Sequence, residues 1–246
     1  MAYNHQDFIA QAIESILMQK TSFDLELIIA NDFSSDNTDA IINKIIDTDI
    51  NAKEKIKYIK NSKNLGMQPN FISAYGFCKG KYIAECEGDD YWTDPLKLQK
   101  QIDFLESNPD YVLCSHKVNI LENGKLKEDD IIHLPDNYEN IDTLAKHGNY
   151  IHTVSVVFRN VFHQFPFEYS ITPLGDYYLY LLLAEQGKIK HLNDAMAVYR
   201  LNSGIWSEKS NYYRNFKTAL THALLYKYFN KKNNTVIASI LLERIQ

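Results

Sequence analysis

An alternation of helix-like and strand-like segments from Phe8 to Ser107 limits the possible folds more than any other feature of this chain. Apolar residues recur at helical spacing in the helix-like segments, and the strand-like segments are short apolar runs typical of strands buried on both faces. The predicted helices are 8–17, 38–47, 68–79 and 95–107, and the predicted strands are 25–30, 56–59 and 82–86. This order predicts an α/β fold with a mostly parallel sheet covered by helices on both faces.

The second half of the chain is less regular. Asn123-Gly124 is a strong hairpin signal that follows a strand predicted at 111–120. Further strands are expected at 154–158 and 195–200, and further helices at 174–186 and 212–229. The sequence has no internal repeat, low-complexity segment or obvious linker, so we expect one domain over residues 1–246.

The start of the chain departs from this alternation. A strand should precede the helix at 8–17, yet only Met1-Ala2-Tyr3 stands before the polar pair Asn4-His5. We therefore expect a first strand that is a stub or has been shortened.

Composition excludes several classes of protein. Hydrophobic residues make up 45% of the chain, which is enough for a full core, and the formal net charge of -5 offers no basic field to a nucleic acid. The lysines over 53–63 are interpreted as a solvated connection rather than a patch for anionic lipid. Cys78, Cys86 and Cys114 form no CxxC pair, and there is no signal peptide or membrane-spanning run. These features indicate a cytoplasmic protein with reduced cysteines.

Acidic and polar residues follow the predicted strands, in loops at 3–5, 31–32 and 87–90. Ligands of open parallel sheets bind beyond the carboxyl ends of the strands, where such loops converge. The glycine-rich motifs that cradle phosphates are absent, so a diphosphate near these carboxylates would need a bridging cation. The oxygens of Glu87, Asp89 and Asp90 suit Mg²⁺ or Mn²⁺. The alternative is an ordinary acidic loop whose neighbour Asp94-Pro95 caps a helix.

These motifs together resemble the family 2 glycosyltransferases of the GT-A fold. The resemblance is dense over about positions 3–115 and returns at Gly175-Asp176 and Tyr199-Arg200. The matching residues are Tyr3-Asn4-His5, Leu25 to Ala30 followed by Asn31-Asp32, Asn64-x-Gly66, Glu87-Gly88-Asp89-Asp90-Tyr91-Trp92, and Pro95 with Lys97-Leu98. The resemblance implies a Rossmann-like GT-A domain with a nucleotide-sugar and metal-binding half at 1–115 and an acceptor-binding half at 116–246.

The resemblance also implies a reaction, in which a sugar moves from a nucleotide-diphosphate sugar to an acceptor hydroxyl with inversion at the anomeric carbon. Tyr3 would stack on the base, and Asp32 would accept a hydrogen bond from it. Asn4 and Asn64 match other positions of the donor site. For Tyr3 the alternative is a frayed terminal residue.

Further roles follow from the same resemblance. Asp89 matches the donor-contacting position and Asp90 the metal-contacting position, with Glu87 in contention as a ligand although the family more often has Asp there. Asp176 matches the catalytic base, the alternative being a helix N-terminal Asp stabilised by the helix dipole. Arg200 is expected at the diphosphate, or as a plain surface arginine.

The acceptor side is less defined. Many relatives carry His two residues after this Arg, whereas this chain has Asn202; His152 and Trp206 are candidate acceptor-site residues. The family's commonest acceptors are surface glycans and lipid-linked glycans, which is compatible with contact at the inner face of a membrane. Two rival hypotheses are an inactive nucleotide-sugar-binding protein and a dinucleotide-binding oxidoreductase; the missing glycine fingerprint argues against the second.

Overall fold

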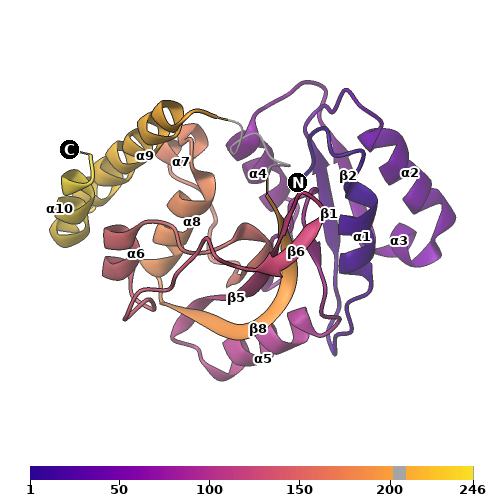
Figure 1. Cartoon of the computed structure of the whole chain (residues 1–246), viewed down its shortest axis with the longest axis horizontal. Coiled ribbons are helices and arrows are strands. Elements are labelled where there is room, and N and C mark those ends of the chain that lie inside the picture. The colour runs from indigo at the N-terminus through magenta and orange to yellow at the C-terminus, as the bar shows by residue number, and fades with distance from the viewer. Residues whose placement is uncertain (202–208, 246) are drawn as a thin grey trace.

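Figure 1 shows the computed structural model, which describes residues 1–201 and 209–245. The helices are α1 (Ile9–Leu17), α2 (Thr38–Thr48), α3 (Ile50–Lys55), α4 (Met67–Tyr75), α5 (Lys97–Ser107), α6 (Ile141–His147), α7 (Phe167–Ile171), α8 (Gly175–Ala184), α9 (Asn211–Lys231) and α10 (Thr235–Glu243), with one 3-10 turn, η1 (Thr153–Ser155). The strands are β1 (Leu27–Asn31), β2 (Ile56–Lys60), β3 (Tyr82–Ala84), β4 (Tyr91–Trp92), β5 (Tyr111–Glu122), β6 (Lys125–Glu128), β7 (Val157–Arg159) and β8 (Lys188–Arg200).

The strands form two sheets. β1 and β2 make a parallel pair, and the other strands follow the order β3-β7-β5-β8-β4 with β6 paired to β5 as the predicted hairpin. The α/β class with helices on both faces is confirmed, and the central sheet is mixed: β1–β2 and β5–β8 pair in parallel. β3, β4, β6 and β7 all pair antiparallel, since strands from the irregular second half return beside those of the first. The chain is thus a mixed-sheet α/β protein.

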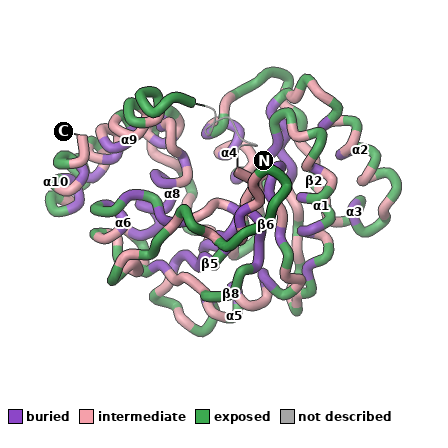
Figure 2. Tube along the Cα trace, viewed as in Figure 1, coloured by how far each residue is buried: buried purple, intermediate pink, exposed green. Residues whose placement is uncertain are grey.

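Helices cover the sheets on both sides, and Figure 2 shows the most buried backbone at the centre around β5 and α8. α8 is apolar all round, and nine of its ten residues are buried, as expected of a helix enclosed by other elements. α1 buries a single stripe that includes Ile9 and Ile13 against Ile29 of β1 and Ile42 of α2. At the far end from the N-terminus, α9 and α10 pack on each other and on α6 and α7.

Several helices and strands begin or end at other residues than predicted, because hydrogen bonds in the folded chain set their boundaries. α4 ends at Tyr75 because the chain turns at Gly76, where the N–H groups of Phe77 and Cys78 bond carbonyls three residues back. β8 begins at Lys188, well before the expected Ala195, because its polar first half pairs with β5. The expected division at 115/116 falls inside β5, so both halves share that strand. No helix within the described residues is long and apolar enough to cross a bilayer.

The predicted stub at the amino end is present. Ala2 forms an isolated parallel bridge with Asn31, and its N–H donates to the carbonyl of Ala30 at 2.9 Å. The strand expected before α1 is therefore represented by one paired residue.

Candidate active site

The polar loops predicted to converge do meet at one edge of the molecule. The N–H of Asp32, just after β1, donates to the carbonyl of Ala2 at 2.9 Å, and the N–H of Gly88, after β3, donates to the carbonyl of Met1 at 2.8 Å. Both loops are thus held on the first two residues of the chain. This arrangement places Asp32 and the acidic loop at 87–90 on the same side of the fold.

Carboxylates gather on the acidic loop. One oxygen from each of Glu87, Asp89 and Asp90 lies within 4.8 Å of the others. Asp90 is 1% exposed; its Oδ1 accepts a hydrogen bond from the N–H of Arg200 at 2.7 Å, and its Oδ2 is buried with no partner among the described residues. A buried, unpaired carboxylate oxygen is costly unless a cation meets it. These three side chains therefore fit a hard divalent cation such as Mg²⁺ or Mn²⁺.

The charge state of the loop supports the same conclusion. Burial raises the pKa of Asp90 well above its usual value, and the neighbouring Asp89 and Glu87 raise it further. Burial likewise raises the pKa of Glu87 to about 7, with Asp89 as the next cause. Carboxylates that repel one another in this way gain most from a bound cation, which favours the ionised form of each.

Gly88 has no room for a side chain. A Cβ there would lie 2.5 Å from Nδ1 of His5 and 3.1 Å from the carbonyl oxygen of Met1. We expect Gly88→Ala to push the acidic loop off the N-terminal residues and to cost about 1–3 kcal/mol of stability. Thermal unfolding of the variant measures this loss. Gly76→Ala is the matched control, because its Cβ would meet nothing closer than 3.4 Å, and an unchanged melting temperature in both variants would contradict the packing argument.

The Tyr3-Asn4 turn is anchored rather than frayed. The Asn4 N–H donates to the hydroxyl of Ser34 at 2.9 Å, and the Asn4 Oδ1 accepts from the N–H of Ser35 at 2.8 Å. Asn4 adopts a positive φ of 56°, which Asn tolerates better than most residues. Tyr3 lies between the bonded residues Ala2 and Asn4, and the residue as a whole is 36% exposed. Its ring is accessible to a ligand, as base stacking requires.

Asp32 is buried and positions the following loop. Its Oδ1 accepts from the side chain of Asn61 at 2.9 Å and from the N–H of Leu65 at 2.8 Å, and its Oδ2 accepts from the N–H of Gly66 at 2.9 Å. A carboxylate can accept about four hydrogen bonds, so Asp32 keeps capacity for one more. Asn64 lies exposed in this loop and accepts from the same Gly66 N–H at 2.9 Å. Asp32 and Asn64, from two different loops, therefore accept a hydrogen bond from the same N–H group.

Arg200 braces the acidic loop. Its guanidinium donates to the carbonyl of Asp89 at 2.8 Å and to the side chain of Gln11, and it lies over the rings of Phe8 and Tyr91 at 4.9 and 4.8 Å. The hypothesis of a plain surface arginine is wrong, because the side chain joins α1, the loop and β8. Its expected contact with a diphosphate stays a prediction.

Asp176 begins α8 and faces the same space. Its Oδ2 accepts from the side chain of Asn149 at 2.7 Å, and its Oδ1 accepts from the N–H of Tyr177 at 2.7 Å. Burial raises the pKa of Asp176. Burial raises the pKa of the Tyr199 hydroxyl, and the charges of Glu87, Asp90, Asp89 and Asp176 raise it further. The charge of Asp176 also adds to the effects of burial and Asp89 on the pKa of Glu87. The predicted base and the acidic loop therefore lie within electrostatic reach of each other.

His152 borders this space as well. Its Nε2 lies 2.9 Å from Oδ2 of Asp129, and its ring lies 4.8 Å from that of Tyr199. Tyr199 directly precedes Arg200, whose N–H binds Asp90, so this ring contact places His152 beside the site. Trp206, the other acceptor-site candidate, and Asn202, which stands where many relatives have His, are outside the described residues.

Sequence reasoning missed several residues of this site. Asn149 and Asp129 come from loops with no periodicity or motif, and Gln11 is an unremarkable polar position of α1. Tyr199 could have been found, because it directly precedes Arg200 at the end of a predicted strand. Each of these residues orients a predicted site residue or lies against one.

The fold and the acidic edge together have the layout of a GT-A protein, in which loops at the strand ends surround a metal-dependent donor site. The chain matches the model for glycosyl transferase family 2 over residues 1–203 and belongs to that family.

Two curated relatives illustrate the match. The uncharacterized protein Rv1520 of Mycobacterium tuberculosis is 33% identical over 91% of this chain, which spans 64% of that relative's length. The Escherichia coli protein WfaP, named UDP-Glc:alpha-D-GlcNAc-diphosphoundecaprenol beta-1,3-glucosyltransferase, is 31% identical over 82% of this chain and 76% of its own.

Solved structures confirm the GT-A fold. Staphylococcus aureus TarS 1–349 in complex with UDP-GlcNAc has a TM-score of 0.69 at 15% identity, covering 99% of this chain and 70% of TarS. The mannosyltransferase PcManGT from Pyrobaculum calidifontis, in complex with GDP-Man and Mn²⁺, has a TM-score of 0.64 at 14% identity, covering 99% of this chain and 67% of its own. At such identities the likeness concerns the fold.

Proposed function

We propose that this protein is an inverting glycosyltransferase that moves a sugar from a nucleotide-diphosphate sugar to an acceptor hydroxyl. The observation that carries the proposal is the unpartnered Oδ2 of Asp90 within a cluster of three carboxylates, on the edge that Asp176 also faces. Three findings support the same class of reaction: membership of the family, the glucosyltransferase name of WfaP, and the UDP-GlcNAc bound in the TarS structure.

The donor would bind in the half formed by residues 1–115. Tyr3 would stack on the base and Asp32 would use its remaining lone pair for a base N–H. Asn4 and Asn64, in the two loops already described, would border the bound donor. Arg200 would shift one N–H from its present partner to the diphosphate, which a planar guanidinium can bind with two hydrogen bonds.

A bound Mg²⁺ or Mn²⁺ would neutralise the diphosphate and make it a better leaving group. Asp90, Asp89 and Glu87 would supply hard oxygen ligands for it, and the longer Glu87 side chain reaches the cluster from the position where Asp is more usual. Burial raises the pKa values of Glu87 and Asp90 in the metal-free protein. The proposal requires both carboxyl groups to be ionised when the metal binds.

Asp176 is the proposed general base. Its ionised carboxylate would take the proton of the acceptor hydroxyl while that oxygen forms a bond to the anomeric carbon. The bond from this carbon to the diphosphate oxygen breaks in the same displacement, so the configuration inverts. The hydrogen bond from Asn149 holds the Asp176 carboxylate in one orientation.

A thermal-shift screen tests the proposal. UDP-, GDP- and dTDP-sugars are compared with and without Mn²⁺, because a ligand that binds the folded state raises the melting temperature. One class of donor should stabilise the protein, and only when metal is present. An NAD(H) arm covers the rival oxidoreductase. A response to NAD(H) alone, or to no sugar nucleotide, would refute the assignment.

For the acceptor we propose a surface glycan or a lipid-linked glycan reached at the inner face of a membrane. The N-terminal part of α9 supports this placement, because Tyr212 is 83% exposed and Phe216 is 56% exposed on one side of the helix. Lys209, Arg214 and Lys217 stand among them. Exposed aromatic rings with basic neighbours suit an anionic lipid surface.

We expect the protein to sediment with vesicles that contain phosphatidylglycerol and not with neutral ones. Tyr212→Ser combined with Phe216→Ser should weaken this binding about thirtyfold or more, since each ring that enters the lipid contributes about 1 kcal/mol or more. Leu126→Ser is the control, because Leu126 is 57% exposed on β6, away from α9. Equal binding of the double variant and the original protein would exclude α9 as the contact.

A further inference from the structure

Two side chains near Asp176, those of Gln68 and Glu85, carry buried polar atoms without partners. Gln68 stands in the first turn of α4, and Glu85 directly follows β3. Among the described residues, neither Nε2 of Gln68 nor Oε1 of Glu85 has a hydrogen-bond partner. Buried polar groups are nearly always hydrogen-bonded, so this pair indicates a ligand that supplies the missing partners.

Gln68 links the Asp32 loop to the start of α8. It follows Gly66, whose N–H donates to Asp32 at 2.9 Å, and it is only 8% exposed. A Cβ added to Gly175 would lie 2.5 Å from Nε2 of Gln68, so the Gln68 amide packs directly against the residue before Asp176. The glycine leaves room for this amide, which lies beside the proposed base.

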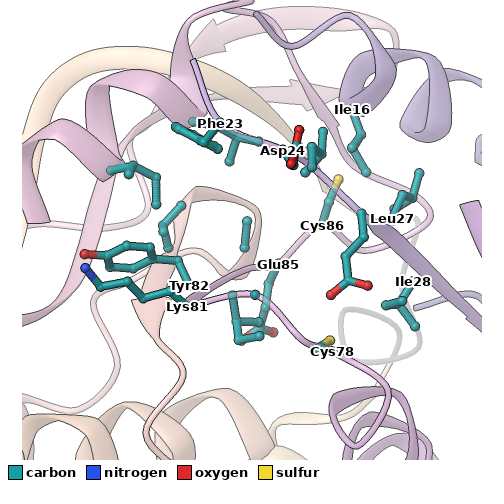
Figure 3. Close-up of a pocket in the computed structure, with 18 of the residues that line it drawn as sticks. Ile16, Phe23, Asp24, Leu27, Ile28, Cys78, Lys81, Tyr82, Glu85 and Cys86 are labelled. Atoms are coloured by element: carbon teal, nitrogen blue, oxygen red, sulfur yellow. The ribbon is translucent and has the colours of Figure 1, made fainter. Parts of the chain in front are cut away.

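The Glu85 side chain lies on the side of the sheet that α8 covers. The Glu85 N–H donates to the carbonyl of Val156 at 3.3 Å, so the chain stays paired just beyond β3. Side chains alternate along such a segment, and Ile83 belongs to the core cluster that contains most of α8. Glu85 therefore points to the α8 side, and in Figure 3 the side chains of Glu85 and Cys86 leave the chain in opposite directions.

Gln68 and Glu85 occupy corresponding positions at the edge of the core. Phe71 is one turn after Gln68 on the same face of α4, and Ile83 is two residues before Glu85 on the same face of the strand. Phe71 and Ile83 belong to one core cluster. Gln68 and Glu85 continue this cluster toward the strand ends, where the acidic loop and Asp176 lie.

The chemistry of the pair fits a hydroxyl group rather than a cation. Among the described residues, the carboxylates that could hold a metal are those of Glu87, Asp89 and Asp90, without Glu85. The amide N–H groups of Gln68 would also repel a cation. A hydroxyl group both donates and accepts, so it can donate to Oε1 of Glu85 and accept from Nε2 of Gln68 at once.

The proposed reaction indicates which hydroxyl group this is. The transferred sugar would lie between the metal-bound diphosphate and Asp176, because its anomeric carbon is bonded to the diphosphate and attacked by the oxygen that Asp176 deprotonates. Burial raises the pKa of Glu85 to about 8, and the charges of Glu87 and Asp176 raise it further. The Glu85 carboxyl group is thus within electrostatic reach of both ends of this path, where the sugar ring would lie.

We propose that Gln68 and Glu85 bind one hydroxyl group of the transferred sugar and thereby help to select the donor. This inference rests on the proposed function and assigns part of its specificity. A donor without that hydroxyl group, or with it in the opposite configuration, would leave both buried polar groups unpaired and would bind more weakly.

The test compares a nucleotide sugar with its own nucleoside diphosphate. Calorimetric titration with Mn²⁺ present uses the sugar selected by the thermal-shift screen and the matching UDP, GDP or dTDP. Gln68→Met and Glu85→Met keep the length of each side chain and remove its hydrogen-bonding group. Each should weaken binding of the nucleotide sugar about tenfold and leave binding of the nucleoside diphosphate unchanged. Glu85→Gln keeps a carbonyl oxygen and should retain most of the affinity.

Gln186→Met and Glu54→Met are the matched controls, because both residues are exposed, one just after α8 and the other on α3. They should bind both ligands as the unaltered protein does. Donor analogues that each lack one ring hydroxyl test the inference without any variant. One analogue should bind the unaltered protein about tenfold more weakly than the parent donor, and Gln68→Met should bind the two equally.

Three results would overturn this inference. An equal loss of affinity for the nucleotide sugar and the nucleoside diphosphate would mean that Gln68 and Glu85 act only through the fold. A raised KM for the acceptor with unchanged donor binding would assign the pair to the acceptor. Unchanged binding in both variants would leave the proposed function intact, whereas the absence of any metal-dependent nucleotide binding would overturn both proposals.

Discussion

Asp90→Asn should abolish metal-dependent donor binding and lower kcat/KM for sugar transfer by about 10³-fold, because the metal supplies several kcal/mol of transition-state stabilisation. The amide keeps the shape of the side chain and can still accept the hydrogen bond from the Arg200 N–H, so the loop should stay folded. What it removes is the negative charge next to the unpartnered Oδ2. Calorimetric titration with Mn²⁺ and the donor measures the loss of binding directly.

Asp47→Asn is the control for this variant, because Asp47 is exposed on α2 and its substitution changes the net charge by the same amount. The control should bind Mn²⁺ and donor as the unaltered protein does. The stability of Asp90→Asn in the absence of metal should not fall, since an uncharged amide replaces a carboxyl group whose charged form burial, Asp89 and Glu87 all disfavour. Unchanged Mn²⁺ affinity in Asp90→Asn would mean that the metal, if it binds, is held elsewhere.

Whether a helix or strand could be predicted from the sequence depended on the kind of interaction that stabilises it. Most first-half elements were predicted because each buries an apolar face or run, as α1 does through Ile9 and Ile13, whereas the short α3 and β4 were not predicted. The sheet pairing was not found, because β3 and β4 pair with strands from the second half that carry no local signal for their partners. Short helices such as α6 and α7 were also missed, since tertiary packing rather than periodicity holds them.

The candidate site shows the same division. Asp32 and Asp90 could be selected because each follows an apolar run, and the ends of such strands share an edge. Asn149 could not be selected, because its importance arises only from its hydrogen bond to Asp176, 27 positions along the chain. The double use of Arg200, as a brace for Asp89 and as an expected diphosphate ligand, also depends on side-chain geometry that no spacing predicts.

Asp176→Asn should separate catalysis from binding. The amide cannot take a proton from the acceptor, so kcat should fall by about 10²–10⁴-fold while the donor still binds with metal. This outcome would also exclude the rival hypothesis of an inactive binding protein, because a protein without turnover has no activity to lose. Transfer of radiolabelled sugar measures kcat, and a thermal shift with donor and Mn²⁺ measures binding.

The pH dependence of kcat gives the base a second test. A general base works only when ionised, and burial raises the pKa of Asp176, so kcat should fall as the pH drops through that raised pKa. Saturating donor and metal remove the contribution of Glu87, whose pKa of about 7 affects metal binding in the free protein. The residual activity of Asp176→Asn should lack this acidic limb. Asp142→Asn, at the first turn of α6, removes a helix N-terminal carboxylate without touching the site and should leave kcat and its profile unchanged. If both Asn variants lose activity equally, Asp176 acts only through its helix.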